Sequence, residues 1–219
     1  RHRQLRLGDG DRPAAFQRTL DINITGVFNT ARAAIPELEK TKGYLLVVSS
    51  LAAFAAAPPG LAAYNASKAG VEHFANALRL EVSHLGIAVG CAHMSWIDTP
   101  LVQDAKKDLS TFQEMLTKLP PPLNKTTDVD ACVKAFVKGG VEKRSRHVYC
   151  PGWVRGGAGL NRNVINSAVG NLPILRFVPD LLPRMDAEVR HWGGRRARGT
   201  WPTTSGRRRG RADPPRGRR

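Results

Sequence analysis

The chain has 219 residues, 42% hydrophobic and 6% aromatic, which is enough for one domain with a substantial aliphatic core. Its net charge of +16 taken alone would indicate nucleic acid or an anionic surface as a partner. Residues 190–219 weaken that interpretation, because their eleven arginines and single acid, Asp213, hold ten of those positive charges.

The cysteines and the absence of long apolar runs indicate the compartment. Cys91, Cys132 and Cys150 form no CxxC pair, and so sparse a set argues against a disulfide framework or a metal site and favours a reducing compartment. No apolar run reaches the roughly 18 residues that a bilayer requires, and the charged opening "RHRQLRLGDGDR" is unlike a signal peptide. We therefore predict a cytoplasmic protein without a membrane span. The first residue is arginine, which indicates a fragment, a processed chain or a misplaced start.

The first half of the chain predicts a helix and a strand. Residues 1–13 are polar and are expected to be irregular, whereas apolar residues recur at helical spacing from Phe16 to about Leu38. The run "GYLLVVSS" at 43–50 is apolar and rich in valine, as in a buried strand of a parallel sheet. The following "APPG" predicts a loop.

Further alternation of helices and strands follows. A helix is expected from the stretch "AAYNASKAGVEHFANALRLEV" at 62–82, and a second buried strand from "LGIAVGCAHM" at 85–94. The loop "SWIDTP" leads into a mobile helical segment at 101–118, which ends before the three prolines at 120–122.

One more helix and one more strand complete the predicted domain. The helix in "TTDVDACVKAFVKGG" is capped by Thr126, Thr127 or Asp128 and is expected to stop at Gly139 and Gly140. "RHVYCPG" at 146–152 predicts a third strand. Alternating helices and buried strands argue for an α/β domain with a parallel sheet.

The last part of the chain divides at residue 190. In "RGGAGLNRN", Arg162 occupies the place of the third glycine of a dinucleotide fingerprint, so a flexible loop is expected there. Residues 153–189 as a whole predict a substrate lid or an interface segment, with short helices interrupted by prolines. Residues 190–219 consist largely of arginine, glycine and proline and predict a disordered tail. Nucleic-acid binding through these arginines and a reading-frame artefact are the alternatives.

Several reactive side chains are expected at one edge of the sheet. Open α/β sheets bind ligands at the carboxyl ends of their strands, where Ser49, Ser50, Tyr64 and Lys68 would meet, with Asn23 in the preceding helix. A phenol has an ordinary pKa of about 10, and an ammonium four residues away on a helix favours the phenolate. A serine hydroxyl nearby can bind a substrate oxygen, so the group suits proton transfer at a carbonyl.

The segment "LDINITGVFNT…VVSSLAAFAAAPPGLAAYNASKAGVEHF…GIAVGCAHMSWIDTP" resembles the short-chain dehydrogenase/reductase family over residues 14–152. The resemblance implies a Rossmann-type doubly wound parallel sheet. It also implies a catalytic tetrad. Asn23 would maintain a helix distortion and a proton-relay water, Ser50 (with Ser49 as the fallback) would polarise the carbonyl, and Tyr64 would be the acid/base. Lys68 would assist Tyr64 and hold the nicotinamide ribose.

The resemblance further implies NAD or NADP as cofactor, with its nicotinamide amide held by the Ile97 backbone and the Thr99 side chain. Three departures are visible. The spacing from Ser50 to Tyr64 is 14 positions, about one more than is usual, and "HMS" replaces a common Pro-Gly pair. The family's Gly-rich turn, its cofactor-selecting strand and its Asn-Asn-Ala-Gly turn do not occur, so the fold is expected to be N-terminally truncated by roughly 70–100 residues.

Two main hypotheses follow. The first is an oxidoreductase that moves a hydride between a nicotinamide cofactor and a small-molecule carbonyl or secondary alcohol. The second is an inactive fragment that retains the family's dimerisation helices, here 16–38 and 62–83, which also make a homo-oligomer the expected assembly. Nucleic-acid binding through the tail is the weakest of the alternatives.

Overall fold

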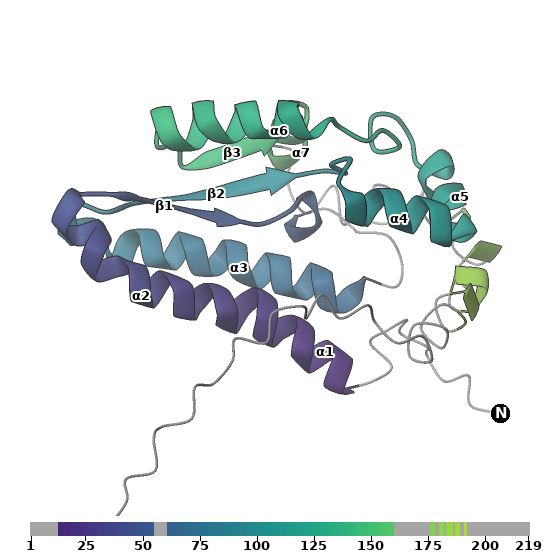
Figure 1. Cartoon of the computed structure of the whole chain (residues 1–219), viewed down its shortest axis with the longest axis horizontal. Helices are drawn as coiled ribbons and strands as arrows, with labels where there is room; N and C mark the ends of the chain where they lie inside the picture. Colours follow the sequence, from purple (N-terminus) through teal and green to yellow (C-terminus); the bar gives the residue numbers. More distant parts are fainter. Residues whose placement is uncertain are drawn as a thin grey trace, which may run out of the picture.

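The computed structural model describes an α/β unit with one parallel sheet. In the part of the chain that the structure describes, three strands pair in the order β1-β2-β3. Figure 1 shows α2 and α3 on one face of this sheet and α6 on the other. The described residues are 13–54, 61–159, 176–177, 180–181, 183–185, 187–188 and 191. The main elements are α1 (Pro13–Leu20), α2 (Gly26–Thr41), β1 (Tyr44–Val48), α3 (Ala62–Glu81), β2 (Ala88–Met94), α4 (Pro100–Asp108), α5 (Ser110–Lys118), α6 (Val129–Phe136), β3 (His147–Cys150) and α7 (Val154–Gly159).

The predicted architecture is confirmed. The strands expected at 43–50, 85–94 and 146–152 are β1, β2 and β3, and the sheet is parallel throughout. The register pairs Tyr44 with Ala88 at one end of β1 and Val48 with Ala92 at the other. Because both strands run in the same direction, their carboxyl ends and the loops that follow lie at one edge of the sheet.

The main core lies between the sheet and the two helices α2 and α3. Val71, Ala75 and Leu78 lie at helical spacing on α3 and are buried against the strands. The strands contribute Val47 from β1 and Val89 from β2. This packing fixes the orientation of α3 about its own axis.

The first predicted helix is longer than its apolar pattern and contains a distortion. It runs from Pro13 to Thr41, with a π-helical turn, η2 (Asp21–Thr25), between α1 and α2. Such a turn inserts one extra residue into the helix, and π-helical turns often occur at functional sites. Asn23 lies within it.

The helix that begins at residue 129 was expected to stop at Gly139 and Gly140, and this expectation was wrong. Asp128 caps α6 as expected, accepting from the backbone amides of Asp130 and Ala131. The helix then continues as a π-helix, η5 (Val137–Glu142), through both glycines. A Cβ at Gly139 would lie 2.9 Å from Val148 Cγ2, so the glycine allows the helix to pack closely on β3.

The prediction of a flexible loop after β3 was also wrong in part. Residues Val154–Gly159 form the short helix α7, whose first residue is fully buried and donates its amide to the Pro151 carbonyl. Residues 160–175, the "APPG" turn, residues 1–12 and 192–219 lie outside the described residues. The disordered tail and its alternatives therefore stay predictions.

The described residues between 176 and 191 pack on α5. Phe177 and Leu181 are buried with Met115 and Leu116 in a second apolar cluster. Glu188 accepts hydrogen bonds from the backbone amides of Ser110, at 2.7 Å, and Thr111, at 2.9 Å, and from both hydroxyls. Since α5 has no side-chain cap of its own, Glu188 supplies one from 77 residues away. Whether this segment is a lid stays a prediction.

Two further findings concern the part of the chain that the structure describes. No helix there is both long and apolar enough to cross a bilayer. No three His, Cys, Asp or Glu side chains there are placed to hold a metal ion, and the three cysteines are free.

Removal of the Glu188 charge is expected to release the start of α5. Burial raises the pKa of Glu188, but the hydrogen bonds from Thr111 and Ser110 outweigh it and leave the pKa below its ordinary value. The carboxylate therefore stabilises α5 above the ordinary pKa and stops doing so as pH falls through the lowered one. In Glu188→Gln we expect faster hydrogen exchange of the Ser110 and Thr111 amides at pH 7, with the difference from wild type vanishing in acid.

The matched control is Glu37→Gln, because Glu37 forms an exposed pair with Lys40 on α2. It should leave exchange at α5 unchanged. Equal exchange in Glu188→Gln and wild type at pH 7 would show that the carboxylate does not hold this segment.

Candidate active site

The carboxyl edge of the sheet collects most of the residues expected to be functional. Ser49 and Ser50 follow β1 directly, and Ile97 and Thr99 follow β2. Tyr64 lies in the first turn of α3, which begins after the connection from β1. The structure thus places all of these residues in segments that begin or end at one edge of the sheet.

The two serines after β1 have different environments. Ser49 is only 1% exposed, and its hydroxyl donates to the Lys68 carbonyl at 3.0 Å. Ser50 is half-buried, accepts from the Ala52 amide at 3.2 Å and makes a long hydrogen bond of 3.5 Å to the Met94 carbonyl. Ser49 therefore fastens α3 to β1, and Ser50 is the serine whose hydroxyl a small molecule could reach.

Tyr64 and Lys68 form a close pair on the first two turns of α3. The Lys68 ammonium lies 5.6 Å from the centre of the Tyr64 ring and donates to the Val48 carbonyl at 3.0 Å. Burial lowers the pKa of Lys68, an effect that Cys91 partly opposes. The bond to Val48 holds the ammonium beside the phenol, so the positive charge can act on it at short range.

Asn23 reaches Tyr64 through a residue that the sequence interpretation missed. The Asn23 amide donates to the Ser67 hydroxyl at 2.9 Å, and that hydroxyl donates to the Tyr64 carbonyl at 2.7 Å. Ser67 is fully buried, and a Cβ at Gly70 would lie 2.8 Å from Ile24, so the π-turn lies close to α3 here. The one available signal was the helical spacing of Ser67 from Val71, which places a hydroxyl on the buried face.

The loop "SWIDTP" is held in place by Thr127. The amide of Thr127 donates to the Trp96 carbonyl at 2.8 Å, and the Asp98 amide donates to the Thr127 carbonyl at 2.9 Å. These bonds involve the neighbours of Ile97, so its own amide N–H is directed away from Thr127. Thr99 is the N-cap residue just before α4, and its hydroxyl makes no capping hydrogen bond.

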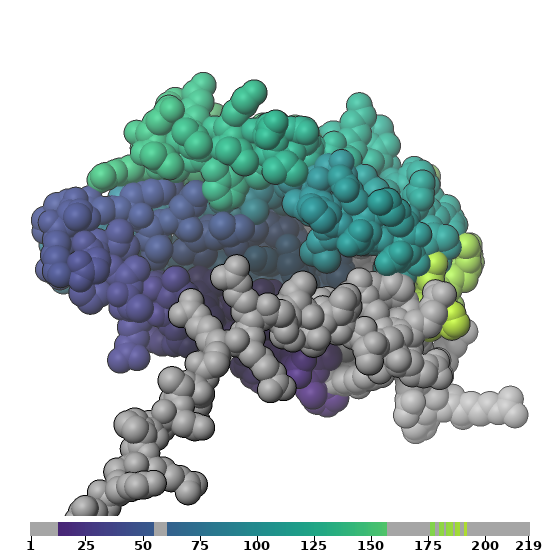
Figure 2. Space-filling model, viewed as in Figure 1, coloured from purple at the N-terminus to yellow at the C-terminus, as the bar shows by residue number. Residues whose placement is uncertain are grey.

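Ile97 and Thr99 line one end of an apolar groove of about 640 Å³. The groove lies between α6 and β1. In Figure 2 the green atoms of α6 lie above the blue and purple atoms of the β1 and α2 region, with the teal atoms of α4 beside them. The other lining residues are Tyr44, Leu46, Met94, Val129, Cys132, Val133, Phe136, Val137, Gly140 and Val141. At the end lined by Ile97 and Thr99, the groove combines apolar walls with polar groups, so it could accept a ligand that has a flat ring and one polar amide.

Fold and site together define a Rossmann-type α/β protein with a tyrosine–lysine pair at the carboxyl edge of its sheet. Residues 8–110 match the sequence model of the short chain dehydrogenases. This match covers 103 of the 219 residues, and over that segment the chain is similar to the short-chain dehydrogenase/reductase family. The expectation drawn from its motifs is therefore confirmed.

Curated relatives support the same family. Retinol dehydrogenase 5 of Homo sapiens is 33% identical over 106 residues, which are 48% of this chain and 32% of that protein. A peroxisomal 2,4-dienoyl-CoA reductase of Saccharomyces cerevisiae is 38% identical over 86 residues, 39% of this chain and 29% of that protein. L-fucose dehydrogenase of Mus musculus is 27% identical over 181 residues, 80% and 64% of the two chains. The chain thus spans only part of each relative.

Solved structures share the fold. A short-chain dehydrogenase of Burkholderia cenocepacia in complex with NADP has a TM-score of 0.56 at 24% identity, covering 72% of this chain and 60% of that one. A short-chain dehydrogenase of Sphingobium yanoikuyae in complex with NADPH has a TM-score of 0.53 at 25% identity, covering 67% and 54%.

Loss of the Ser67 hydroxyl is expected to loosen the attachment of the π-turn to α3. Ser67→Ala removes two buried hydrogen bonds and leaves the Asn23 amide without its acceptor, so the free energy of unfolding should fall by about 1–3 kcal/mol. Urea denaturation measures this difference. The control is Ser83→Ala, because Ser83 is exposed and bonds locally to the Leu80 carbonyl; it should change stability by less than about 0.5 kcal/mol. Equal effects of the two changes would contradict the role of Ser67.

Proposed function

We propose that this chain carries the catalytic residues of an NAD(P)-dependent oxidoreductase that acts on a small-molecule carbonyl or secondary alcohol. The observation that carries the proposal is the Tyr64–Lys68 pair, with the ammonium 5.6 Å from the ring centre and anchored to the Val48 carbonyl. Ser50, at the end of β1, adds an accessible hydroxyl. The similarity to the short-chain dehydrogenase/reductase family supports this assignment of roles.

Each residue has a distinct part in the proposed reaction. In reduction, the Ser50 hydroxyl binds the substrate oxygen and Tyr64 donates the proton that converts it to an alcohol. Lys68 stabilises the phenolate that remains, because its positive charge is held close and partly desolvated. Asn23 acts through Ser67 as a positioning residue for the first turn of α3. In oxidation the proton moves in the opposite direction.

The residues present fit the nicotinamide end of either NAD or NADP. The groove is apolar, and at one end it carries the Thr99 hydroxyl and the Ile97 backbone, which could bind the ring's amide. Lys68 could bind a ribose hydroxyl from beside Tyr64. When bound, the nicotinamide supplies or accepts the hydride. A cytoplasmic location is proposed with this function, supported by the three free thiols among the described residues.

Tyr64→Phe is expected to lower the rate of carbonyl reduction by about 10²- to 10⁴-fold, since the ring remains but the proton is lost. The rate is measured as NADH or NADPH consumption over a panel of aldehydes and ketones. Cofactor binding is followed separately by the fluorescence of Trp96, which precedes Ile97 in the loop. Unchanged turnover in the variant would rule out Tyr64 as the acid/base.

The two serines provide a matched comparison. Ser50→Ala should lower kcat and leave the melting temperature nearly unchanged, because its hydroxyl is half-buried and weakly bonded. Ser49→Ala should lower the melting temperature, because it breaks the buried bond to the Lys68 carbonyl. The reverse pattern would make Ser49 the substrate-binding serine.

A second candidate is a homo-oligomer that forms through α1, α2 and α3 without requiring catalysis. Large apolar side chains on this surface are exposed, among them Ile22 at 65% and Leu80 at 75%. Phe28 is also exposed and packs edge-on against Phe74 across α2 and α3, with ring centres 6.1 Å apart. Exposed apolar groups on adjacent helices are typical of protein interfaces.

Ile22→Asp is expected to shift the protein from dimer to monomer in sedimentation velocity, because a charge would be buried in the interface. Leu101→Asp is the control, since Leu101 is 80% exposed on α4, which lies apart from α2 and α3 (Figure 1). Identical sedimentation of the wild type and the Ile22 variant would exclude this interface. Dimerisation without any NADH- or NADPH-dependent fluorescence change would favour the inactive oligomer over the oxidoreductase.

A further inference from the structure

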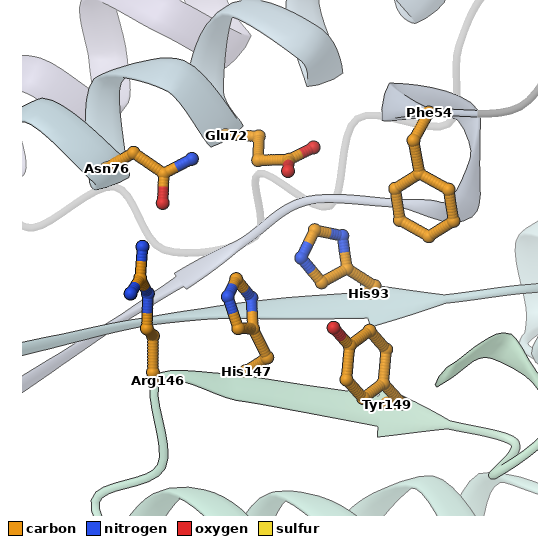
Figure 3. A pocket seen from close by; sticks show the side chains of 7 residues that line it. All are labelled: Phe54, Glu72, Asn76, His93, Arg146, His147 and Tyr149. Carbon is orange, nitrogen blue, oxygen red and sulfur yellow. The ribbon is translucent and has the colours of Figure 1, made fainter. Parts of the chain in front are cut away.

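A second, polar cavity lies on the other face of the sheet from the apolar groove. It has a volume of about 240 Å³ and lies between α3 and the strands β2 and β3 (Figure 3). None of the proposed catalytic residues lines it. The lining residues are Phe54, Glu72, Asn76, His93, Arg146, His147 and Tyr149.

Stacked rings form one wall of this cavity. His93 stacks on Tyr149 with ring centres 5.4 Å apart, and Tyr149 stacks on His147 at 5.9 Å. Phe54 lies against His93 at 5.1 Å. Four rings in mutual contact are held by one another and by the strands, so this wall is preorganised.

Positive charge exceeds negative charge around the cavity. Arg146 lines its mouth, and Arg79 lies behind Asn76, donating to the Asn76 side chain at 2.8 Å and to the Val89 carbonyl at 2.7 Å. The one acid among the lining residues is Glu72. The arginines also repel nearby positive charge. Burial lowers the pKa of Arg79, and Arg146 lowers it further. Burial is likewise the largest cause of the lowered pKa of His147, to which both arginines add.

Polar ring atoms of two lining residues add to the site. Nδ1 of His147 is buried and makes no hydrogen bond to any described residue. Burial, with a smaller effect of Glu72, raises the pKa of Tyr149, so its phenol stays a proton donor near neutral pH. Figure 3 shows the Arg146 guanidinium directed along the cavity toward Asn76, on the same side as His147. A phenol, an imidazole nitrogen and a guanidinium therefore surround a small volume.

We propose that this cavity is a binding site for a small oxyanion, a carboxylate or phosphate group held by Arg146, His147 and Tyr149. A guanidinium binds either group through paired, charge-assisted hydrogen bonds. The volume admits a small molecule rather than a polymer. Glu72 opposes the anion, so its charge limits the affinity of the site.

The test is a titration of the full chain with inorganic phosphate and, separately, with acetate, followed by the His147 ring signals in NMR. Saturable shifts are expected, together with a rise in the pKa of His147, because a bound anion favours the imidazolium. Saturation by only one of the two probes identifies which oxyanion the site takes. Shifts that never saturate with either probe would overturn the proposal.

Adjacent arginines supply the matched variants. Arg146→Gln should weaken binding by about tenfold or more, since a charged hydrogen-bond donor is lost. Arg144→Gln should leave binding within about twofold, because the Arg144 guanidinium donates to the Lys42 carbonyl and does not line the cavity. Equal affinities in the two variants would contradict the assignment to Arg146.

The sign of the Glu72 effect separates an anion site from a cation site. Glu72→Gln keeps the size and polarity of the side chain but removes the opposing charge, so phosphate or acetate should bind more tightly. Weaker binding in this variant would mean that the carboxylate contributes to binding, which would overturn the oxyanion assignment. Circular dichroism of each variant confirms that the fold is retained before affinities are compared.

Discussion

The arrangement of the candidate site depends on how the first turns of α3 are fastened to their surroundings. Two buried serine hydroxyls do this: one comes from the end of β1 and donates to a carbonyl of the helix, and the other lies on α3 itself and accepts from the π-turn. Ser49, from the end of β1, bonds to Lys68, and Ser67 bonds to Tyr64 while accepting from Asn23. A buried hydrogen bond contributes little net stability but is costly to break, so these contacts define one position for the helix. The position of the helix in turn determines where the Tyr64 phenol and the Lys68 ammonium lie.

The two faces of β1 are covered differently, and this determines where a flat ligand can lie. On one face, Val47 packs under α2 and α3 in the main core. On the other face, Tyr44 and Leu46 open into the apolar groove beside α6. The groove therefore runs from the start of β1 to the loop after β2. Only the end with Ile97 and Thr99 lies near the proposed site, and the remainder is an apolar surface bounded by valines of α6 and η5.

Local patterns predicted the elements, and contacts between distant residues decided the rest. Apolar runs and helical spacing were sufficient to locate β1, β2, β3 and α3. They could not separate the roles of Ser49 and Ser50, because both follow the same strand and only the position of α3 distinguishes them. The glycines of η5 were misinterpreted because glycine permits close packing as well as helix termination, and only Val148 shows which applies. Glu188 lies 77 residues from the amide it caps, beyond any local pattern.

The periodicity of α3 explains how one helix contributes residues both to the candidate active site and to the polar cavity. Tyr64, Lys68, Glu72 and Asn76 are spaced by four residues, and at 3.6 residues per turn each step rotates by about 40° beyond a full turn. A polar stripe with this spacing winds slowly around the helix. Its first members lie at the carboxyl edge of the sheet, and its later members line the cavity beneath β2 and β3. The buried residues Val71, Ala75 and Leu78 fill the positions between them and face the core. The same packing that fixes the tyrosine–lysine pair therefore also fixes the carboxylate and amide of the polar cavity.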